Sequence, residues 1–333
     1  MQKNEYAVAV DCGKTNTKVV VTDCEGKVIA RDIFPTKISD DISQNDNTLV
    51  KSKTFRYGGR SFSVDDENIV CETSTLNTKN DDIHKVCTMY GIAKNVPNNS
   101  VVHVTIGCPL TVFGRGINEK NTYRDNLLPK GRIDCDIIDH GNAEHKYFEI
   151  SGRMVIPESM GILFTNSELS AKNIALIDIG GLNVNASIVK KGAVVPSSCV
   201  TLKGGSKSLF NTLRQKYNEI LEPEDIQFTN NNDIPLFIKK GGVTNYLNQT
   251  REPTCRIVGE HIKSIIGELK SHEGWESIKT LDTLVFVGGT SELLKSYIKS
   301  LGDNVEVVEN AIFANAEGFC KSMYDAINKQ AVR

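Results

Sequence analysis

Apolar positions near the start of the chain form two short runs separated by a polar turn. Tyr6–Val10 and Lys18–Thr22 are rich in β-branched and small apolar residues, and the segment between them, DCGKTNT, contains a glycine. This pattern predicts two strands joined by a tight turn. A similar order of apolar run, glycine turn and apolar run begins at Ile174, which lies 167 residues after Ala7. The repeat predicts two lobes, each opening with the same β-hairpin.

Helical spacing of apolar residues marks several later segments. Residues 81–95 carry an apolar stripe that includes Val86 and Tyr90, and two aspartates at its start favour a helix N-terminus. The polar stretch 39–47 predicts an exposed loop. Further helices are predicted after Gly205, over residues 257–269, after Ser291, which would be the N-cap, and over about 313–330.

The turn of the first hairpin contains Gly13-Lys14-Thr15, which resembles the end of a Walker A phosphate loop. A Walker A loop needs another glycine five residues before Gly13, and a helix must follow the loop. Val8 occupies the required glycine position, and a β-branched run follows the turn. The turn therefore lacks a helix N-terminus that could bind phosphate, and we reject the Walker A interpretation.

The composition is that of a soluble globular protein, and it restricts the possible partners. A chain of 333 residues favours two lobes, and its net charge of −2 gives no basic field for direct binding of nucleic acid. The first five residues are polar and no apolar run approaches the ~20 residues of a membrane span, which indicates neither a signal peptide nor a membrane partner. The nine cysteines form no C-x-x-C pair, which favours reduced thiols. We therefore expect a cytoplasmic protein.

Both predicted hairpins place glycine two residues after an aspartate. Asp11 precedes Gly13 in the first hairpin, and Asp178 precedes Gly180 and Gly181 in the second. Glycine allows the backbone to turn tightly, and successive N–H groups in such a turn can bind an anion. A bare aspartate repels phosphate, whereas a hydrated Mg²⁺ between the two groups would explain the combination. The repeated motif therefore indicates a site for a triphosphate and Mg²⁺.

Two glycine pairs farther along the chain extend this pattern. Gly204-Gly205 precedes a predicted helix, and Gly288-Gly289-Thr290 follows an apolar strand, which would suit close approach to a flat nucleoside. Together with the hairpins, these residues resemble the actin, Hsp70 and sugar-kinase superfamily. The hairpins are similar to its phosphate-1 and phosphate-2 motifs, and the last glycine pair to its adenosine motif. The resemblance implies an α/β actin-like fold of the duplicated ribonuclease H type, with a nucleotide cleft between two lobes.

Four other segments resemble bacterial ParM-type actin-like ATPases, which segregate plasmids. They are Thr105–Phe113, Lys53–Val64, Val155–Ser159 and Asn310–Phe319. This resemblance implies ATP-dependent self-association into filaments, with a DNA-bound adaptor of the ParR type at the filament ends. It also implies that residues 1–163 and 313–333 form lobe I, including a small β subdomain over about 35–95, and that residues 164–312 form lobe II.

The same resemblance implies roles for single residues. Glu158 is expected to be catalytic, orienting and activating the attacking water at hydrogen-bond distance, about 2.6–3.2 Å. Asp11 and Asp178 are expected to hold Mg²⁺ through water, and ATP or ADP is the expected nucleotide, with GTP possible. The residues expected to bind the nucleotide and its metal are Asp11, Gly13, Lys14, Thr15, Asn16, Lys18, Asp178, Gly180, Gly181, Leu182, Asn183, Gly204, Gly205, Gly288, Gly289 and Thr290.

The second hairpin departs from the family pattern. Leu182 and Asn183 replace small or hydroxyl residues, and Asn185 replaces an acid. This departure puts the rate of hydrolysis in doubt, and two alternative functions stay open. One is a small-molecule kinase of the same superfamily, acting on a sugar or acetate, and the other is a non-dynamic actin-like structural adaptor. The ribose-binding acid is also open, with Glu219, Glu222 and Asp225 as candidates.

Overall fold

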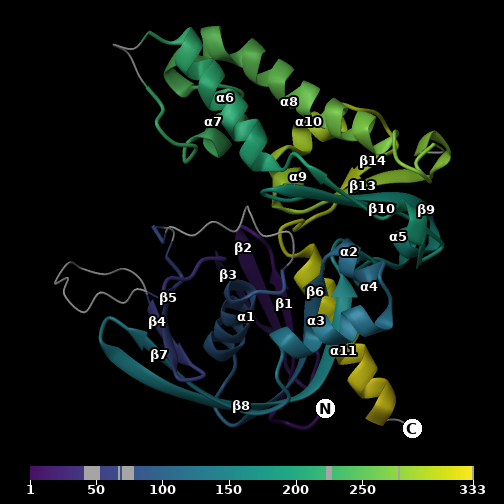
Figure 1. Cartoon of the computed structure of the whole chain (residues 1–333). Helices are drawn as coiled ribbons and strands as arrows, with labels where there is room; N and C mark the ends of the chain where they lie inside the picture. The colour runs from purple at the N-terminus through teal and green to yellow at the C-terminus, as the bar shows by residue number, and fades with distance from the viewer. Residues whose placement is uncertain (41–52, 67, 70–78, 223–226, 277, 332–333) are drawn as a thin grey trace. The chain divides into compact units, whose positions relative to one another are not determined.

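The computed structural model divides into two compact units. The first comprises Met1–Thr165 and Asn315–Arg333, and the second comprises Asn166–Ala314. Each unit is built on one mixed β-sheet with helices packed against it (Figure 1). The structure describes residues 1–40, 53–66, 68–69, 79–222, 227–276 and 278–331, so most of the predicted loop 39–47 lies outside the described residues.

The sheet of the first unit has eight strands in the order β3-β2-β1-β6-β8-β7-β4-β5. β1 pairs antiparallel with β2 and parallel with β6, which in turn pairs parallel with β8. The strands are β1 (Glu5–Cys12), β2 (Asn16–Thr22), β3 (Val28–Pro35), β4 (Lys53–Tyr57), β5 (Arg60–Val64), β6 (Ser100–Cys108), β7 (Gly131–Asp139) and β8 (Asn142–Pro157). The helices are α1 (Asp82–Asn95), α2 (Leu110–Phe113), α3 (Ile117–Leu127), α4 (Ile162–Thr165) and α11 (Ala314–Ala331).

Helices cover both faces of the central strands in the first unit. Val8 of β1 and Val21 of β2 are cross-strand partners and share a core with the apolar stripe of α1. Thr22, the next residue in β2, points to the other face, because side chains alternate along a strand. Its hydroxyl lies 3.1 Å from the Cys320 thiol of α11. This arrangement buries β1 and β2 on both sides and explains their unbroken apolar sequence.

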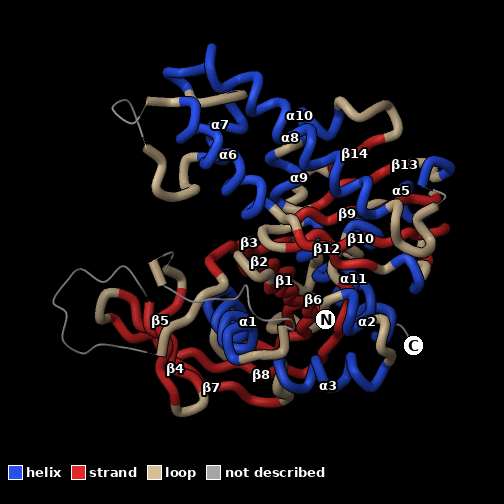
Figure 2. The backbone as a smooth tube through the Cα atoms, turned by 45° about the horizontal axis from the view of Figure 1, so that its top comes forward, coloured by secondary structure: helices blue, strands red, loops and turns tan. Residues whose placement is uncertain are grey.

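The second unit is built on the strand order β11-β10-β9-β13-β14, and β12 also pairs with β10. β9 pairs antiparallel with β10 and parallel with β13. Figures 1 and 2 both show α6, α7 and α8 on the same side of this sheet. The elements are α5 (Ser167–Ala171), β9 (Asn173–Ile179), β10 (Asn183–Lys190), β11 (Ala193–Val194), β12 (Val200–Lys203), α6 (Ser206–Ile220), α7 (Ile234–Lys240), α8 (Leu247–Leu269), β13 (Thr283–Val287), α9 (Gly289–Leu293), α10 (Lys295–Lys299) and β14 (Val305–Val307).

The predicted repeat of the opening hairpin is confirmed at the level of strand register. In β1–β2, Asp11 is the cross-strand partner of Lys18, and in β9–β10, Asp178 is the partner of Asn185. The first strand of each hairpin also pairs with a parallel strand on its other edge. This parallel strand is β6 in the first unit and β13 in the second. The two units therefore present an aspartate at matching positions of matching hairpins.

Two predicted helices differ from their observed form. Ser291 is not an N-cap, because it lies inside α9, where Gly288 is the N-cap and the Ser291 hydroxyl donates to the Val287 carbonyl at 2.5 Å. The single helix expected after it is two short helices, α9 and α10. The helix expected over 257–269 begins earlier, at Leu247, and contains Pro253. A proline removes only one helical hydrogen bond, so a helix with a buried face can continue through it.

Candidate functional site

The first hairpin turns sharply at Gly13. Its N–H donates to the Asn16 carbonyl at 3.0 Å, and a Cβ atom at position 13 would lie only 2.8 Å from the same oxygen. Glycine is therefore required for the turn to close. Directly below the turn, Asp11 is buried and its Oδ2 lies 3.5 Å from the Lys18 ammonium. The structure thus brings Asp11, Gly13 and Lys18 together, as the sequence predicted.

The remaining turn residues of the first hairpin include Thr15, which is bonded next to β3, and Lys14, which lies near other charged groups. The Thr15 carbonyl accepts a hydrogen bond from the Thr36 N–H at 2.9 Å, which fixes the turn against the end of β3. Burial, together with the nearby Lys79 ammonium, lowers the pKa of Lys14. Lys14 in the turn and Lys18 in β2 therefore both add positive charge to the first hairpin.

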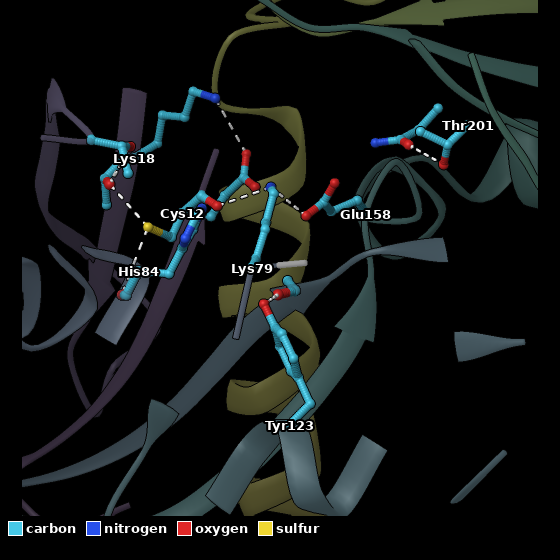
Figure 3. Close-up of polar contacts among 12 residues, drawn as sticks. Cys12, Lys18, Lys79, His84, Tyr123, Glu158 and Thr201 are labelled. Atoms are coloured by element: carbon cyan, nitrogen blue, oxygen red, sulfur yellow. Dashed lines mark hydrogen bonds and ion pairs between the residues drawn. The ribbon is translucent and has the colours of Figure 1, made fainter. Parts of the chain in front are cut away.

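Glu158 lies in the same unit, just after β8, and it is paired with a lysine that sequence analysis did not identify. The Lys79 ammonium lies 2.5 Å from Glu158 Oε1 and 2.9 Å from the Cys12 carbonyl (Figure 3). Burial by itself would lower the pKa of Lys79, but the Glu158 and Asp11 carboxylates outweigh it and the pKa is raised. The predicted catalytic acid therefore faces a protonated, buried lysine.

Backbone contacts fix Glu158 from the side of β6. Its N–H donates to the Cys108 carbonyl at 2.9 Å, and the Tyr123 hydroxyl donates to the neighbouring Gly107 carbonyl at 3.1 Å. A Cβ atom at Gly107 would lie 3.5 Å from both Asp11 Oδ1 and Glu158 Cγ. Gly107 thus lies beside both acids, and the three residues belong to one site at the carboxyl ends of β1, β6 and β8.

A buried polar cluster supports the first hairpin from the side of α1. Asp81 is the N-cap of α1 and accepts from the His84 N–H at 2.9 Å, and His84 Nδ1 lies 2.8 Å from the same oxygen. Burial lowers the pKa of His84 and outweighs Asp81, so the imidazole is neutral at physiological pH. The Cys12 thiol lies 3.2 Å from the Thr17 hydroxyl, and burial raises its pKa to about 11. Cys12 is therefore an inert packing residue.

The second hairpin closes in the same way as the first. The Gly180 N–H donates to the Asn183 carbonyl at 2.9 Å, and Asp178 is buried beneath the turn. The Gly204-Gly205 segment packs directly on this turn, with the Gly205 N–H donating to the Leu182 carbonyl at 3.2 Å. A Cβ atom at position 205 would lie 2.5 Å from the Gly180 carbonyl oxygen, so only glycine allows the approach.

The N-terminus of α6 is bonded to the second hairpin. The N–H groups of Ser206 and Lys207 donate to the Gly180 and Gly181 carbonyls at 3.0 and 2.9 Å. These two helix-terminal donors are therefore used to orient the turn.

The third glycine motif lies against Asp178 in the second unit. Gly288 has φ +89°, and a Cβ atom there would lie 2.2 Å from Asp178 Oδ1. The Thr290 hydroxyl donates to the Gly180 carbonyl at 3.1 Å. Gly289 follows as the first residue of α9. The structure thus brings the second hairpin, Gly204-Gly205 and the motif at 288–290 together at one end of the second sheet.

Comparisons with known proteins agree with this geometry. Residues 9–161 match the family model of the N-terminal domain of actin like proteins. A solved Alp12 filament structure is 25% identical, with a TM-score of 0.71 over 97% of this chain and 99% of that one. Residues 9–161 are thus similar to the N-terminal domain of actin like proteins, and the chain has an actin-like fold. The resemblance to ParM-type proteins and the actin-like fold predicted from the sequence are thereby confirmed.

Two other solved structures share the fold of this chain. The archaeal actin homologue Ta0583 in complex with ADP is 15% identical, with a TM-score of 0.71 over 97% of this chain and 99% of that one. A 15-stranded ParM filament from Clostridium botulinum is 19% identical, with a TM-score of 0.67 over 98% of this chain and 100% of that one. No curated protein matches the sequence. The fold is therefore shared with filament-forming proteins at low sequence identity.

A residue that departs from the expected motif and one of the candidate ribose ligands also have defined positions in the structure. The Asn185 side chain, at the position where an acid is usual, accepts a hydrogen bond from the Thr201 hydroxyl of β12 at 2.8 Å. Among the candidate ribose ligands, Glu219 is exposed and paired with Lys216 near the C-terminal end of α6. A helix rises about 1.5 Å per residue, which places Glu219 about 20 Å along α6 from Gly205. Asp225 lies outside the described residues.

Two properties of the described residues complete the description of the site. Within the described ranges, no group of three or more histidine, cysteine, aspartate or glutamate side chains is arranged to hold a metal ion. Over the same part of the chain, no helix is both long and apolar enough to cross a membrane.

Proposed function

We propose that this actin-like protein is an ATPase that assembles into filaments and drives the segregation of plasmid DNA. The observation that supports this best is the matched pair of hairpins, with Asp11 and Asp178 buried at equivalent register positions beside glycine turns. An ordinary hairpin needs no buried acid below the turn. It also needs no glycine at a position where a Cβ atom would clash with the backbone. Glycine turns expose backbone N–H groups to phosphate oxygens, so phosphate binding at each hairpin explains the duplication.

Mg²⁺ fits the available donors. It binds through one or two carboxylates and keeps several waters, which suits a single buried aspartate in each unit and no larger acidic cluster among the described residues. Asp11 and Asp178 would hold it through water. When bound, Mg²⁺ supplies positive charge that offsets the charge developing on the phosphate.

Glu158 would accept a hydrogen bond from the attacking water and orient it toward the terminal phosphate. Lys18 extends from the strand opposite Asp11 and would place its ammonium near a phosphate oxygen, with Lys14 as a second positive charge. Gly288, Gly289 and Thr290 would lie against the nucleoside, with Gly204-Gly205 completing the phosphate turn. Each proposed role is therefore given to a residue that lies near the others of its own unit.

Filament formation is supported by the solved structures that share the fold. An Alp12 filament and a ParM filament are among them, and the archaeal homologue contains ADP. Self-association with a bound adenine nucleotide is therefore the simplest proposal for this chain, with GTP as an alternative ligand. The role in plasmid segregation and the ParR-type adaptor rest on the resemblance to ParM-type proteins. The net charge of −2 fits contact with DNA through an adaptor.

The test is 90° light scattering of the purified protein after addition of Mg²⁺-ATP, with phosphate release recorded in the same sample. We expect scattering to rise and then decay, and we expect Glu158→Gln to abolish the decay while lowering phosphate release about 100-fold or more. Glu149→Gln is the matched control, because Glu149 is an exposed glutamate on the same strand β8. Its traces should match those of the wild type.

Three results would contradict the proposal. The absence of both scattering and phosphate release over a wide protein concentration range would reject it. Release of ADP only when a sugar or acetate is added would identify the kinase alternative. Scattering that rises and never decays, without phosphate release, would identify the structural adaptor and implicate the Asn185 position of the second hairpin.

A further inference from the structure

We propose that Lys79 is a positioning residue for hydrolysis: its ammonium holds the Glu158 carboxylate in place and connects it to the first hairpin. The inference rests on the proposed ATPase function and deepens it. Lys79 belongs to none of the motifs that support the family resemblance, and its role follows from its contacts alone.

The contacts of Lys79 join two parts of the site. Its ammonium donates to Glu158 Oε1 at 2.5 Å and to the Cys12 carbonyl at 2.9 Å. Cys12 is the last residue of β1, directly after Asp11 and directly before the glycine turn. A displacement of the turn would therefore be transmitted through the ammonium to the proposed catalytic carboxylate.

The environment of this ion pair makes its geometry strict. The side chains of Lys79 and Glu158 are both only 8% exposed. A buried charge is tolerated only when it is paired and hydrogen-bonded, so neither group can leave the other without a large penalty. A carboxylate is planar, so fixing Oε1 also restricts where Oε2 can point. The pair thus limits the directions from which Glu158 could accept a proton or a hydrogen bond from water.

Both ends of the pair are anchored independently. On the lysine side, Asp81 follows two residues later and caps α1 through the His84 N–H at 2.9 Å. On the acid side, the Glu158 N–H donates to the Cys108 carbonyl at 2.9 Å. The ion pair therefore joins two segments that each have hydrogen bonds of their own, and it contributes to the position of the Glu158 carboxylate.

The chain contains a matched lysine for comparison. Lys146 has a side chain that is also 8% exposed, and its ammonium donates to a backbone carbonyl, that of Val96, at 2.9 Å and to the Glu144 carboxylate at 3.2 Å. Val96 is the C-cap of α1, so this lysine lies at the opposite end of the helix from Asp81. Lys146→Met therefore removes a similar set of contacts within the same unit without touching the site.

The experiment compares Lys79→Met, Lys79→Arg and Lys146→Met in the full chain with Mg²⁺-ATP. We expect Lys79→Met to lower kcat about 100-fold, because a misplaced catalytic group costs about that much, while KM and the affinity for a fluorescent ATP analogue change less than about threefold. Lys79→Arg keeps the charge and should recover at least about a tenth of the wild-type kcat. Lys146→Met should lower the melting temperature but leave kcat within about twofold of the wild type.

Several outcomes would overturn the inference. A folded Lys79→Met variant with the wild-type kcat would show that Lys79 does not position Glu158. A higher KM with an unchanged kcat would instead make Lys79 a nucleotide ligand. If Lys79→Met does not fold, Lys79→Ala replaces it, because it removes both donors without placing a new apolar side chain beside Glu158, and a wild-type kcat there is equally decisive. If the wild-type protein releases no phosphate, the proposed ATPase function is rejected together with this inference. If the wild type releases phosphate and only the Lys79→Met prediction fails, the inference alone is rejected.

Discussion

Replacement of Gly288 by alanine should destabilise the second unit more than replacement of the neighbouring Gly289 by alanine. Gly288 has φ +89° and ψ 156°, a conformation that is essentially restricted to glycine. The added Cβ atom would lie 2.2 Å from Asp178 Oδ1 and 2.8 Å from the Ile179 carbonyl oxygen. The backbone, the Asp178 side chain or both must therefore move.

The size of the effect follows from these two contributions. The backbone conformation alone costs an alanine about 1–3 kcal/mol. Overpacking in a close-packed environment adds about 1–3 kcal/mol. The two contributions together come to about 2–6 kcal/mol, and we use about 3 kcal/mol, a value in the lower half of that range. For a protein unit of about 150 residues this lowers the melting temperature by about 6–12 °C. Because the displaced group is Asp178, affinity for Mg²⁺-nucleotide should fall by about tenfold or more in the same variant.

Gly289→Ala is the matched control. A Cβ atom at Gly289 would meet only the Ile312 side chain, at 3.4 Å, and the residue is already helical. The assay is thermal unfolding followed by circular dichroism, with binding of a fluorescent ATP analogue in the presence and absence of Mg²⁺. A Gly288→Ala variant that melts within 2 °C of Gly289→Ala, which is below the smallest shift expected, and binds nucleotide equally well would refute the reasoning.

Two further predictions concern stability of the chain. Gly318→Ala places a Cβ atom 1.8 Å from the Gly161 carbonyl oxygen, so α11 must shift and the free energy of unfolding should fall by about 3 kcal/mol; an unchanged denaturation midpoint would contradict this. Burial lowers the pKa values of His84, His103 and His261 in the folded protein. As pH falls, these histidines are therefore protonated at a higher pH in the unfolded chain than in the folded one. Stability should be fully present above pH ~6.5 and should decrease below it. Urea midpoints at pH 7.5 and 5.5 check this direction, and His84→Gln should weaken the dependence.

The parts of the fold that the sequence predicted are those set by local chemistry. A β-branched run, a glycine turn and a second run define a hairpin with little help from the rest of the chain, and both hairpins formed as predicted. The glycines at 13, 205 and 288 could be recognised because the backbone needs them there, as the positions of a Cβ atom demonstrate. Helix ends were less predictable, because tertiary packing extends α8 through Pro253 and separates α9 from α10.

Lys79 could not be found from the sequence because its importance depends on non-local contacts. It lies 79 residues from Glu158 and 67 from Cys12, and nothing in its neighbours marks it as different from a surface lysine. The available signal was its position just before Asp81, the cap of α1, which suggests only that the segment is ordered. A pairing between distant residues becomes visible only when β1, β8 and α1 are placed in one unit.

The two hairpins share a fold but differ in charge, and this difference separates their roles. Opposite Asp11 the first hairpin carries Lys18, whereas opposite Asp178 the second carries Asn185, which is bonded to Thr201. The first unit also supplies Lys14, Lys79 and Glu158, so the proposed water-orienting acid and its lysine partner belong to the unit of the first hairpin. The second hairpin instead packs on Gly205 and Gly288, with no room for side chains there. In the proposed ATPase, the first unit would therefore supply the water-orienting acid and its lysine partner, whereas the second hairpin would offer mainly backbone groups to a phosphate.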